Sequence, residues 1–222
     1  MSKHLQRDLK DLEQSLLDQS AVVEQMVYRA CEALRELNTD GLREVMADEE
    51  QVNRREVQIE EDCLKILALH QPVAVDLRRV AMVMKINTDL ERIADLAVNI
   101  GERARSLVMH PEFDPPANLD QMAEIAISMV RDALDAFVRL DVEAAREVCL
   151  RDDEVDGLNR QVIADMYDLI AANPSEVEPA LHFYSASRHV ERIGDHATNI
   201  AEDVIYLVEG EIARHRGDNV AI

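Results

Sequence analysis

Carboxylates and an amide recur with the same spacing at two places in this chain. Residues 90–100 read LERIADLAVNI, and residues 190–200, which lie 100 positions later, read VERIGDHATNI. On a helix that advances about 100° per residue, the Glu, Asp and Asn of each copy lie on one narrow stripe. The first stripe is Glu91, Asp95, Asn99 and Glu102, and the second is Glu191, Asp195, Asn199 and Glu202. Packing explains repeated apolar residues, whereas repeated acidic residues indicate a shared site.

A related stripe precedes each copy on another predicted helix. Glu49, Asn53, Glu56 and Glu60 form it in the first half, and Asp152 and Asp156, with Asn159 one turn later, form its counterpart. If these helices are neighbours, two carboxylate stripes face one groove in each half. Carboxylate and amide oxygens are ligands for hard cations. We therefore predict metal ligands at Glu49, Asn53, Glu91, Asp95, Asn99, Asp152, Asp156, Glu191, Asp195 and Asn199, with Glu102, Glu202 and His196 as weaker candidates.

The repulsion within these stripes needs an explanation. Like charges four residues apart destabilise a helix by about 0.2–0.5 kcal/mol per pair. Arg92 and Arg192 could turn back toward the acids, solvent and salt could screen them, or a cation could bridge them. His196 would add a nitrogen ligand that favours iron, zinc or nickel over magnesium, whereas the first copy has Leu96 there. If a cation bridges the stripes, we expect a divalent or transition metal ion, that is iron, zinc, nickel, manganese or magnesium, and His196 would make the second half the better candidate for a transition metal.

Apolar residues three and four positions apart predict a chain of long helices. We expect helices over about 3–37, 41–69, 72–108, 119–139, 142–171 and 175–210. Thr39 or Asp40 is expected to cap the second helix, and Ser175 with Glu178 forms a capping box for the last one. The predicted fold is all-α, with two tandem pseudo-symmetric antiparallel three-helix bundles over residues 1–109 and 119–212, a linker over 110–118 and a polar tail over 213–222.

Composition restricts the partners. Asp and Glu number 45 against 24 Lys and Arg, so the formal net charge is −21. Such a chain repels nucleic acid, and it repels anionic lipid unless its charge is locally inverted, but it attracts divalent cations and basic protein surfaces. The sequence shows neither a membrane-length apolar run nor a signal peptide, and its three cysteines, Cys31, Cys63 and Cys149, lie in apolar helical patterns. We expect a cytoplasmic protein without membrane insertion or disulfides.

Catalytic motifs are missing from the sequence. There is no glycine-rich phosphate loop, nucleophile turn or His-Glu-x-x-His motif. The predicted protein is therefore not an enzyme. A carboxylate-bridged metalloenzyme and a purely structural helical module remain the alternatives to a binding protein.

Several segments together resemble one known family. They are the two repeated segments, Gln71-Pro72-Val73-Ala74-Val75-Asp76-Leu77-Arg78, and the closing Gly210-Glu211-Ile212-Ala213-Arg214-His215. In order and spacing they are similar to the PhoU family of phosphate transport regulators, over essentially the whole chain. Two positions depart from the family pattern: Ala94 replaces a glycine, and Leu96 removes a possible histidine ligand from the first copy.

The resemblance implies a function as well as a fold. It implies a cytoplasmic homodimer that represses the phosphate-starvation (Pho) response and phosphate uptake. It also implies an adaptor between the ATPase subunit of a phosphate ABC transporter and a sensor histidine kinase, with metal clusters at the repeated acidic motif. On this chain that motif is Glu91 and Asp95, and Glu191 and Asp195, with Glu49 and Asn53, or Asp152 and Asp156, from the neighbouring helix.

Overall fold

Six long helices make up the computed structural model, which describes residues 3–210. They are α1 (Lys3–Arg35), α2 (Leu42–His70), α3 (Ala74–Leu107), α4 (Asn118–Arg139), α5 (Val142–Ala172) and α6 (Val177–Glu209), with a short 3₁₀ turn at Pro174–Glu176. No strand occurs within residues 3–210, so the all-α prediction is confirmed. The predicted polar tail at 213–222 lies outside the described residues.

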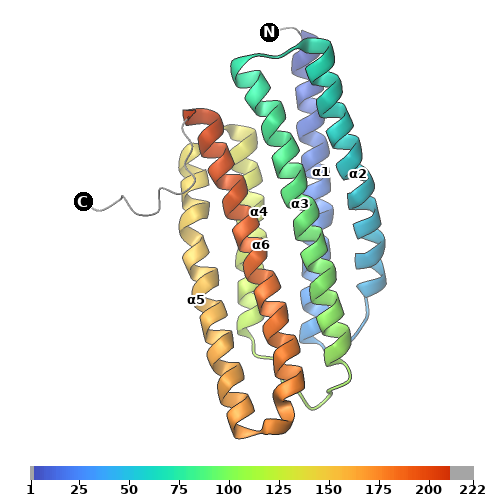
Figure 1. Ribbon diagram of the computed structural model, residues 1–222, viewed down its shortest axis with the longest axis vertical. Helices are drawn as coiled ribbons and strands as arrows, with labels where there is room; N and C mark the ends of the chain where they lie inside the picture. The colour runs from blue at the N-terminus through green and yellow to red at the C-terminus, as the bar shows by residue number, and fades with distance from the viewer. Residues whose placement is uncertain (1–2, 211–222) are drawn as a thin grey trace, which may run out of the picture.

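The helices form two groups of three that lie side by side (Figure 1). α1, α2 and α3 pack on one another, and α4, α5 and α6 do the same. Contacts of α3 with α6 and of α1 with α4 join the groups, which leaves α2 and α5 on the outer flanks. Each outer helix therefore lies beside the central helix that carries the repeated acidic segment. This is the neighbourhood that two facing acidic stripes require.

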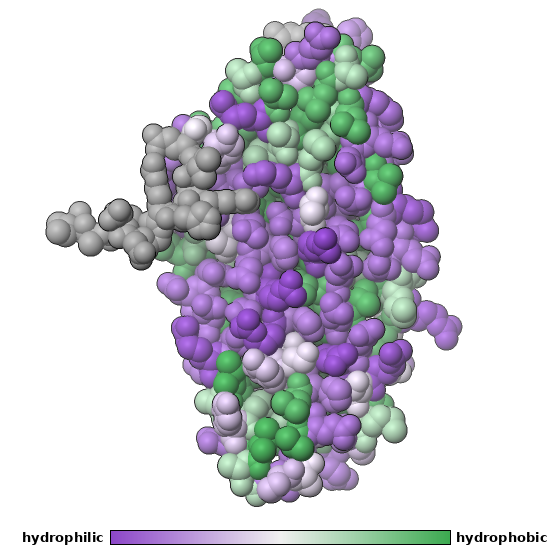
Figure 2. All heavy atoms as spheres, viewed as in Figure 1, coloured by the Kyte–Doolittle hydropathy of each residue, from purple (hydrophilic) through white to green (hydrophobic). Residues whose placement is uncertain are grey.

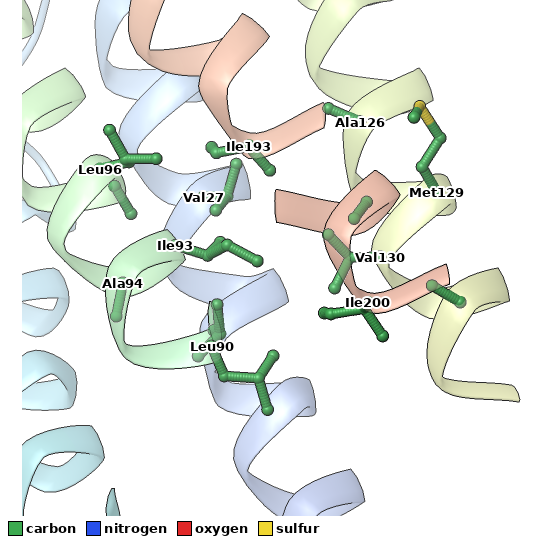
Figure 3. Packing of buried hydrophobic residues seen from close by; sticks show 14 of the residues in the cluster. Val27, Leu90, Ile93, Ala94, Leu96, Ala126, Met129, Val130, Ile193 and Ile200 are labelled. Carbon is green, nitrogen blue, oxygen red and sulfur yellow. The ribbon is translucent and has the colours of Figure 1, made fainter. Parts of the chain in front are cut away.

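One apolar cluster runs through both bundles. The repeated segments contribute fully buried side chains to it, among them Leu90, Ile93, Ile193 and Ile200. Figure 3 shows these side chains together with residues of α1 and α4 such as Val27 and Val130. The apolar half of each repeated segment therefore anchors its helix in the shared core, and the polar half is left at the surface.

Two polar contacts between side chains fix the register of α3 against α6. The Lys85 ammonium lies 2.8 Å from an Asp203 carboxylate oxygen, and His196 Nδ1 lies 2.8 Å from Asp89 Oδ1. As the residue number rises along α3 it falls along α6, so the two helices are antiparallel (Figure 1). The antiparallel packing puts the two acidic segments on opposite flanks of the central helix pair.

Helix boundaries agree with the expected ones to within two residues, but two predicted caps are wrong. Gly41 precedes α2 with a positive φ of 78° and no side-chain cap, so neither Thr39 nor Asp40 caps that helix. At the last helix, Asn173 accepts from the Ser175 backbone N–H and starts a 3₁₀ turn. The predicted capping box of Ser175 with Glu178 does not form, because α6 begins beyond Ser175, at Val177. Within residues 3–210, no helix is long and apolar enough to cross a membrane.

Candidate metal sites on two acidic faces

The predicted ligands lie on two surfaces, which we name the first and second acidic faces. The first acidic face lies on α2 and α3 and comprises Glu49, Asn53, Glu91, Asp95, Asn99 and Glu102. The second acidic face lies on α5 and α6 and comprises Asp152, Asp156, Glu191, Asp195, Asn199 and Glu202. In Figure 2 hydrophilic side chains cover the middle of the surface formed by these four helices.

Close packing of α5 on α6 brings the carboxylates of the second acidic face together. A Cβ on Gly194 would lie 3.3 Å from Asp152 Oδ1 and 3.6 Å from Val155 Cγ1. The missing side chain at Gly194 therefore lets α5 approach α6, with Asp152 next to the turn that carries Asp195. Gly194 therefore has a packing role and is not a candidate ligand.

Burial and neighbouring charges raise the pKa of several acids on the second acidic face. Burial, together with the carboxylates of Asp195 and Asp156, raises the pKa of Asp152 to about 6, against an ordinary value of 3.8. Burial and Asp156 raise the pKa of Asp195 in the same way. The pKa of Glu191 is raised mainly by burial, even though its carboxylate lies 2.5 Å from the Arg188 guanidinium. Arg160 also lies 3.9 Å from Asp156, so the pKa values of these three acids are raised although two arginines pair with the face.

The first acidic face is less crowded. Asn53 donates a hydrogen bond of 2.6 Å to Glu49, and Arg92 lies 3.5 Å from both Glu91 and Asp95. Glu91 has a raised pKa, mainly from burial and then from Asp95. Arg92 therefore turns back toward Glu91 and Asp95, which is the first of the three explanations for how the repulsion within a stripe is reduced. On the second acidic face Arg188 pairs with Glu191 instead, three residues away on the same helix, where we expected Arg192.

His196 does not join the second acidic face. Its ring faces Asp89 of the other bundle, and both side chains are more than four-fifths buried. The corresponding Leu96 is also buried in the core. The expectation that His196 makes the second half a transition-metal site therefore has no geometric support. The histidine joins α6 to α3.

The remaining residues of the predicted stripes differ in burial, and one of them lies outside both acidic faces. Asn159 is buried and accepts a hydrogen bond from the Ser187 hydroxyl at 3.1 Å, so it belongs to the core. Glu102 is exposed, lies 3.5 Å from Arg103, and lines a largely apolar cavity of about 400 Å³ between α2 and α3. Glu202 is half-buried and contributes to the raised pKa of Cys149, which places it toward α5. Asn99 and Asn199 are half-buried on the helices that carry the acidic segments.

Three cysteines were expected to be buried and unpaired. Cys31 and Cys63 are buried, Cys149 is half-buried, and none forms a disulfide. Burial raises the pKa of these thiols to about 12, 12 and 11. They are inert thiols at neutral pH.

The donor chemistry of both faces fits a hard cation. Crowded carboxylates with raised pKa values, and amide oxygens beside them, gain most from a divalent ion that neutralises them. Within residues 3–210, no three His, Cys, Asp or Glu side chains converge around one point that could hold a metal ion. Cation binding would therefore require side-chain rotation at the faces.

Sequence reasoning missed the partners that complete these surfaces. Asp89 receives His196 across the bundles, and Arg188 neutralises part of Glu191. The i, i+3 spacing of Arg188 and Glu191 was a readable signal for the second contact. No local pattern signals the contact between Asp89 and His196, since these residues lie 107 positions apart in the sequence.

Fold and site together define a class: a duplicated helical protein with one acidic face in each half. The sequence model of the PhoU domain matches residues 16–104 and again residues 119–204. The chain belongs to the PhoU family.

Relatives match over nearly the whole chain. A phosphate-specific transport system accessory protein PhoU homolog of Aquifex aeolicus is 37% identical over 210 residues, covering 95% of both chains. The accessory protein PhoU of Escherichia coli is 29% identical over 221 residues, covering 98% of this chain and 92% of the relative. These names describe an accessory protein, in agreement with the prediction that this chain is not an enzyme.

Solved structures share the fold. The crystal structure of PhoU from Pseudomonas aeruginosa superposes with a TM-score of 0.86 at 35% identity, covering 93% of this chain and 99% of that one. The phosphate transport system regulatory protein PhoU from Streptococcus pneumoniae superposes with a TM-score of 0.84 at 26% identity, covering 94% and 98%. The arrangement of two three-helix bundles is therefore shared with solved members of the family.

Proposed function

We propose that this protein is an accessory regulator of a phosphate-specific transport system and represses both phosphate uptake and the phosphate-starvation response. Family membership over nearly the whole chain carries the proposal, because the relatives bear the names of accessory and regulatory proteins of phosphate transport. The protein acts in the cytoplasm as a homodimer. It regulates by binding, since its polar residues are organised as surfaces rather than as a catalytic pocket.

Metal binding is the second part of the proposal. On the second acidic face Asp152, Asp156, Glu191 and Asp195 supply the carboxylates, and Asn199 supplies an amide oxygen. On the first, Glu49, Glu91 and Asp95 supply the carboxylates, with Asn53 and Asn99. The raised pKa values of Asp152, Asp195, Glu191 and Glu91 support this assignment, because each marks a partly desolvated carboxylate that lies near other carboxylates. A bound cation would supply that neutralisation and tie the outer helix to the central one.

Adaptor binding is the third part. We assign the protein two partners, the ATPase subunit of a phosphate ABC transporter and a sensor histidine kinase. A net charge of −21 favours basic surfaces on both partners. Cations on the acidic faces would set the local charge at which such surfaces meet the protein.

Deletion of the gene tests the regulatory role. In cells grown with ample phosphate, we expect the deletion to raise expression from a phosphate-starvation promoter, and the wild-type gene to restore repression. A deletion strain whose promoter stays repressed in ample phosphate would contradict the proposal.

Variants of the second acidic face test whether metal binding and partner binding depend on the same carboxylates. Glu191→Gln with Asp195→Asn should lower metal content in elemental analysis of protein purified without chelator, and should weaken pull-down of the ATPase subunit or the kinase. Glu154→Gln serves as a matched control, because Glu154 is an exposed acid on α5 outside the second acidic face. Unchanged metal content in the double variant would remove the proposed site and would favour a helical module without a metal.

A further inference from the structure

Both ends of the molecule expose apolar side chains. At the turn between α2 and α3, Leu69 is 77% exposed and Val73 is 75% exposed. At the turn between α5 and α6, Tyr167 is 73% exposed and Leu181 is 57% exposed. Figure 2 shows hydrophobic side chains gathered at the top and the bottom of the molecule, with hydrophilic ones between them. The two turns occupy corresponding places in the two bundles (Figure 1).

The two ends differ in charge. We name residues 3–10 and 64–80 the basic tip, and the corresponding residues 118–125 and 164–184 the acidic tip. The basic tip contains six Lys or Arg and two Asp, whereas the acidic tip contains six Asp or Glu and no Lys or Arg. Asp11 and Asp62 lie just outside these ranges and line the same cavity as Leu69. In a chain with a net charge of −21, the inversion of charge is therefore confined to the outermost turns of this end.

Contacts between the helices assemble the basic tip from segments far apart in the sequence. His70 at the end of α2 lies 2.9 Å from Asp8 of α1, and Arg79 of α3 forms an ion pair with Glu13 of α1. The first turns of α1 therefore lie beside the turn from α2 to α3, as Figure 1 also shows.

Exposed cations surround the apolar turn. Lys3 and Lys10 are exposed, and the side chains of Arg7 and Lys65 are 67% and 57% exposed. Arg7 and Lys65 also contact Asp8 and Asp62, so part of their charge is balanced locally. The Lys3 and Lys10 ammonium groups stay available to an external anion.

The apolar turn has a defined shape. Pro72 is buried within it, and the Gln71 backbone N–H donates to the Leu67 carbonyl at 3.1 Å. Val73 and Val75 project from this turn with 75% and 49% of their surface exposed. A fixed loop with apolar side chains can insert into a surface without first losing much conformational freedom.

We propose that the basic tip docks on an anionic phospholipid surface, with the turn from α2 to α3 entering the headgroup region and the long axis of the molecule standing away from the surface. Apolar insertion surrounded by Lys and Arg is the chemistry that binds proteins peripherally to anionic membranes. The two most exposed apolar side chains of the basic tip, Leu69 and Val73, belong to one turn beside exposed cations, which favours insertion into an anionic lipid surface over a broad interface with an acidic protein. The acidic tip also exposes apolar side chains, but its negative charge is repelled by anionic lipid, so it faces away from the membrane.

Co-sedimentation with lipid vesicles tests the proposal. The full-length protein should sediment with phosphatidylcholine vesicles that contain about one third phosphatidylglycerol, but not with phosphatidylcholine alone, and about 0.5 M NaCl should reverse the binding. Leu69→Ser with Val73→Ser, and Lys3→Glu with Lys10→Glu, should each weaken binding about tenfold or more. The acidic-tip pair Tyr167→Ser with Leu181→Ser and the α2 pair Arg43→Glu with Arg54→Glu are the controls and should bind as the wild type does.

Three outcomes would overturn the proposal. They are no binding to the anionic vesicles, unchanged binding by both basic-tip variants, and equal loss in the acidic-tip control. If the basic-tip variants instead lose pull-down of a purified acidic partner while the wild type never binds vesicles, the basic tip recognises protein and not lipid. Vesicle binding requires neither metal nor the regulatory partners, so its failure would leave the proposed function standing.

Discussion

The two acidic faces share one plan and differ in charge. Alignment of Val52 with Val155 places Asn53 of the first face where the second has Asp156. In the first face the amide donates a hydrogen bond to Glu49, whereas in the second a carboxylate repels Asp152. The pKa of Asp152 rises to about 6. Burial and Asp195 contribute most to this rise, and the carboxylate of Asp156 adds to it. Together they make the second acidic face the stronger candidate for a cation.

The second half is the better candidate for a cation site, but not because of its histidine. The sequence suggested that His196 distinguishes the halves, because the first copy has Leu96. The ring of His196 instead bonds to Asp89 across the bundles. The difference between the faces therefore lies in the burial and crowding of their carboxylates, and an all-oxygen donor set is one that hard divalent ions such as magnesium or manganese would accept.

The largest expected effect is the loss of cation stabilisation. A cation present at about 100 times its Kd stabilises the folded state by about 2.7 kcal/mol. With Mn²⁺ at about 100 times the Kd of the tighter sites, Glu191→Gln with Asp195→Asn should abolish most of the rise in Tm, and Glu91→Gln with Asp95→Asn should abolish less. Differential scanning calorimetry of chelator-treated protein measures both shifts. Equal losses in the two variants would remove the distinction between the faces.

His196→Ala tests the reassignment of the histidine. Loss of its hydrogen bond to the mostly buried Asp89 should lower the free energy of unfolding by about 1–2 kcal/mol. Urea unfolding measures this loss, and Mn²⁺ affinity should not change. A variant that is fully stable but binds Mn²⁺ more weakly would restore His196 as a metal ligand.

Asp152→Asn tests the crowding directly. A carboxyl whose pKa is about 6 when folded and 3.8 when unfolded binds protons more readily in the folded state. Without cations the wild type should therefore lose stability as the pH rises from about 4 to about 6, by about 1 kcal/mol after allowance for solvent screening. Asp152→Asn should flatten this part of the pH profile and be more stable than the wild type at pH 7. A difference between the wild-type and Asp152→Asn profiles that stays constant from pH 4 to pH 6 would contradict the raised pKa of Asp152.

Exchange of the amide and the carboxylate at the corresponding positions 53 and 156 should give the smallest change in stability, and it compares the two faces most directly. Asp156→Asn should stabilise the cation-free protein by about 0.5 kcal/mol, and Asn53→Asp should destabilise it by a similar amount. Chemical denaturation at pH 7 and low salt measures both changes. If both variants shift stability in the same direction, the faces do not differ by charge at these positions.

Sequence periodicity was sufficient for the fold and for most of each face. Helices are local structures, so apolar spacing located all six, and the same periodicity placed Glu91 beside Asp95 and Glu191 beside Asp195. The two wrong caps have local causes, since Gly41 adopts a positive φ and Asn173 starts a 3₁₀ turn.

Contacts between bundles could not be predicted in this way. His196 meets Asp89, and Lys85 meets Asp203, only because α3 and α6 pack antiparallel with one particular register. Nothing in the local spacing of these residues specifies that register. The burial of Asn159 likewise depends on Ser187 of another helix.

Calorimetric titration of Mn²⁺ into chelator-treated protein tests the central claim most directly. We predict a tighter class of sites that disappears in Glu191→Gln with Asp195→Asn, and a weaker class that disappears in Glu91→Gln with Asp95→Asn. The Glu154→Gln control should retain both classes. A wild type that binds no Mn²⁺, or a tighter class that survives when Glu191 and Asp195 are changed, would contradict the claim that the second acidic face is the principal cation site.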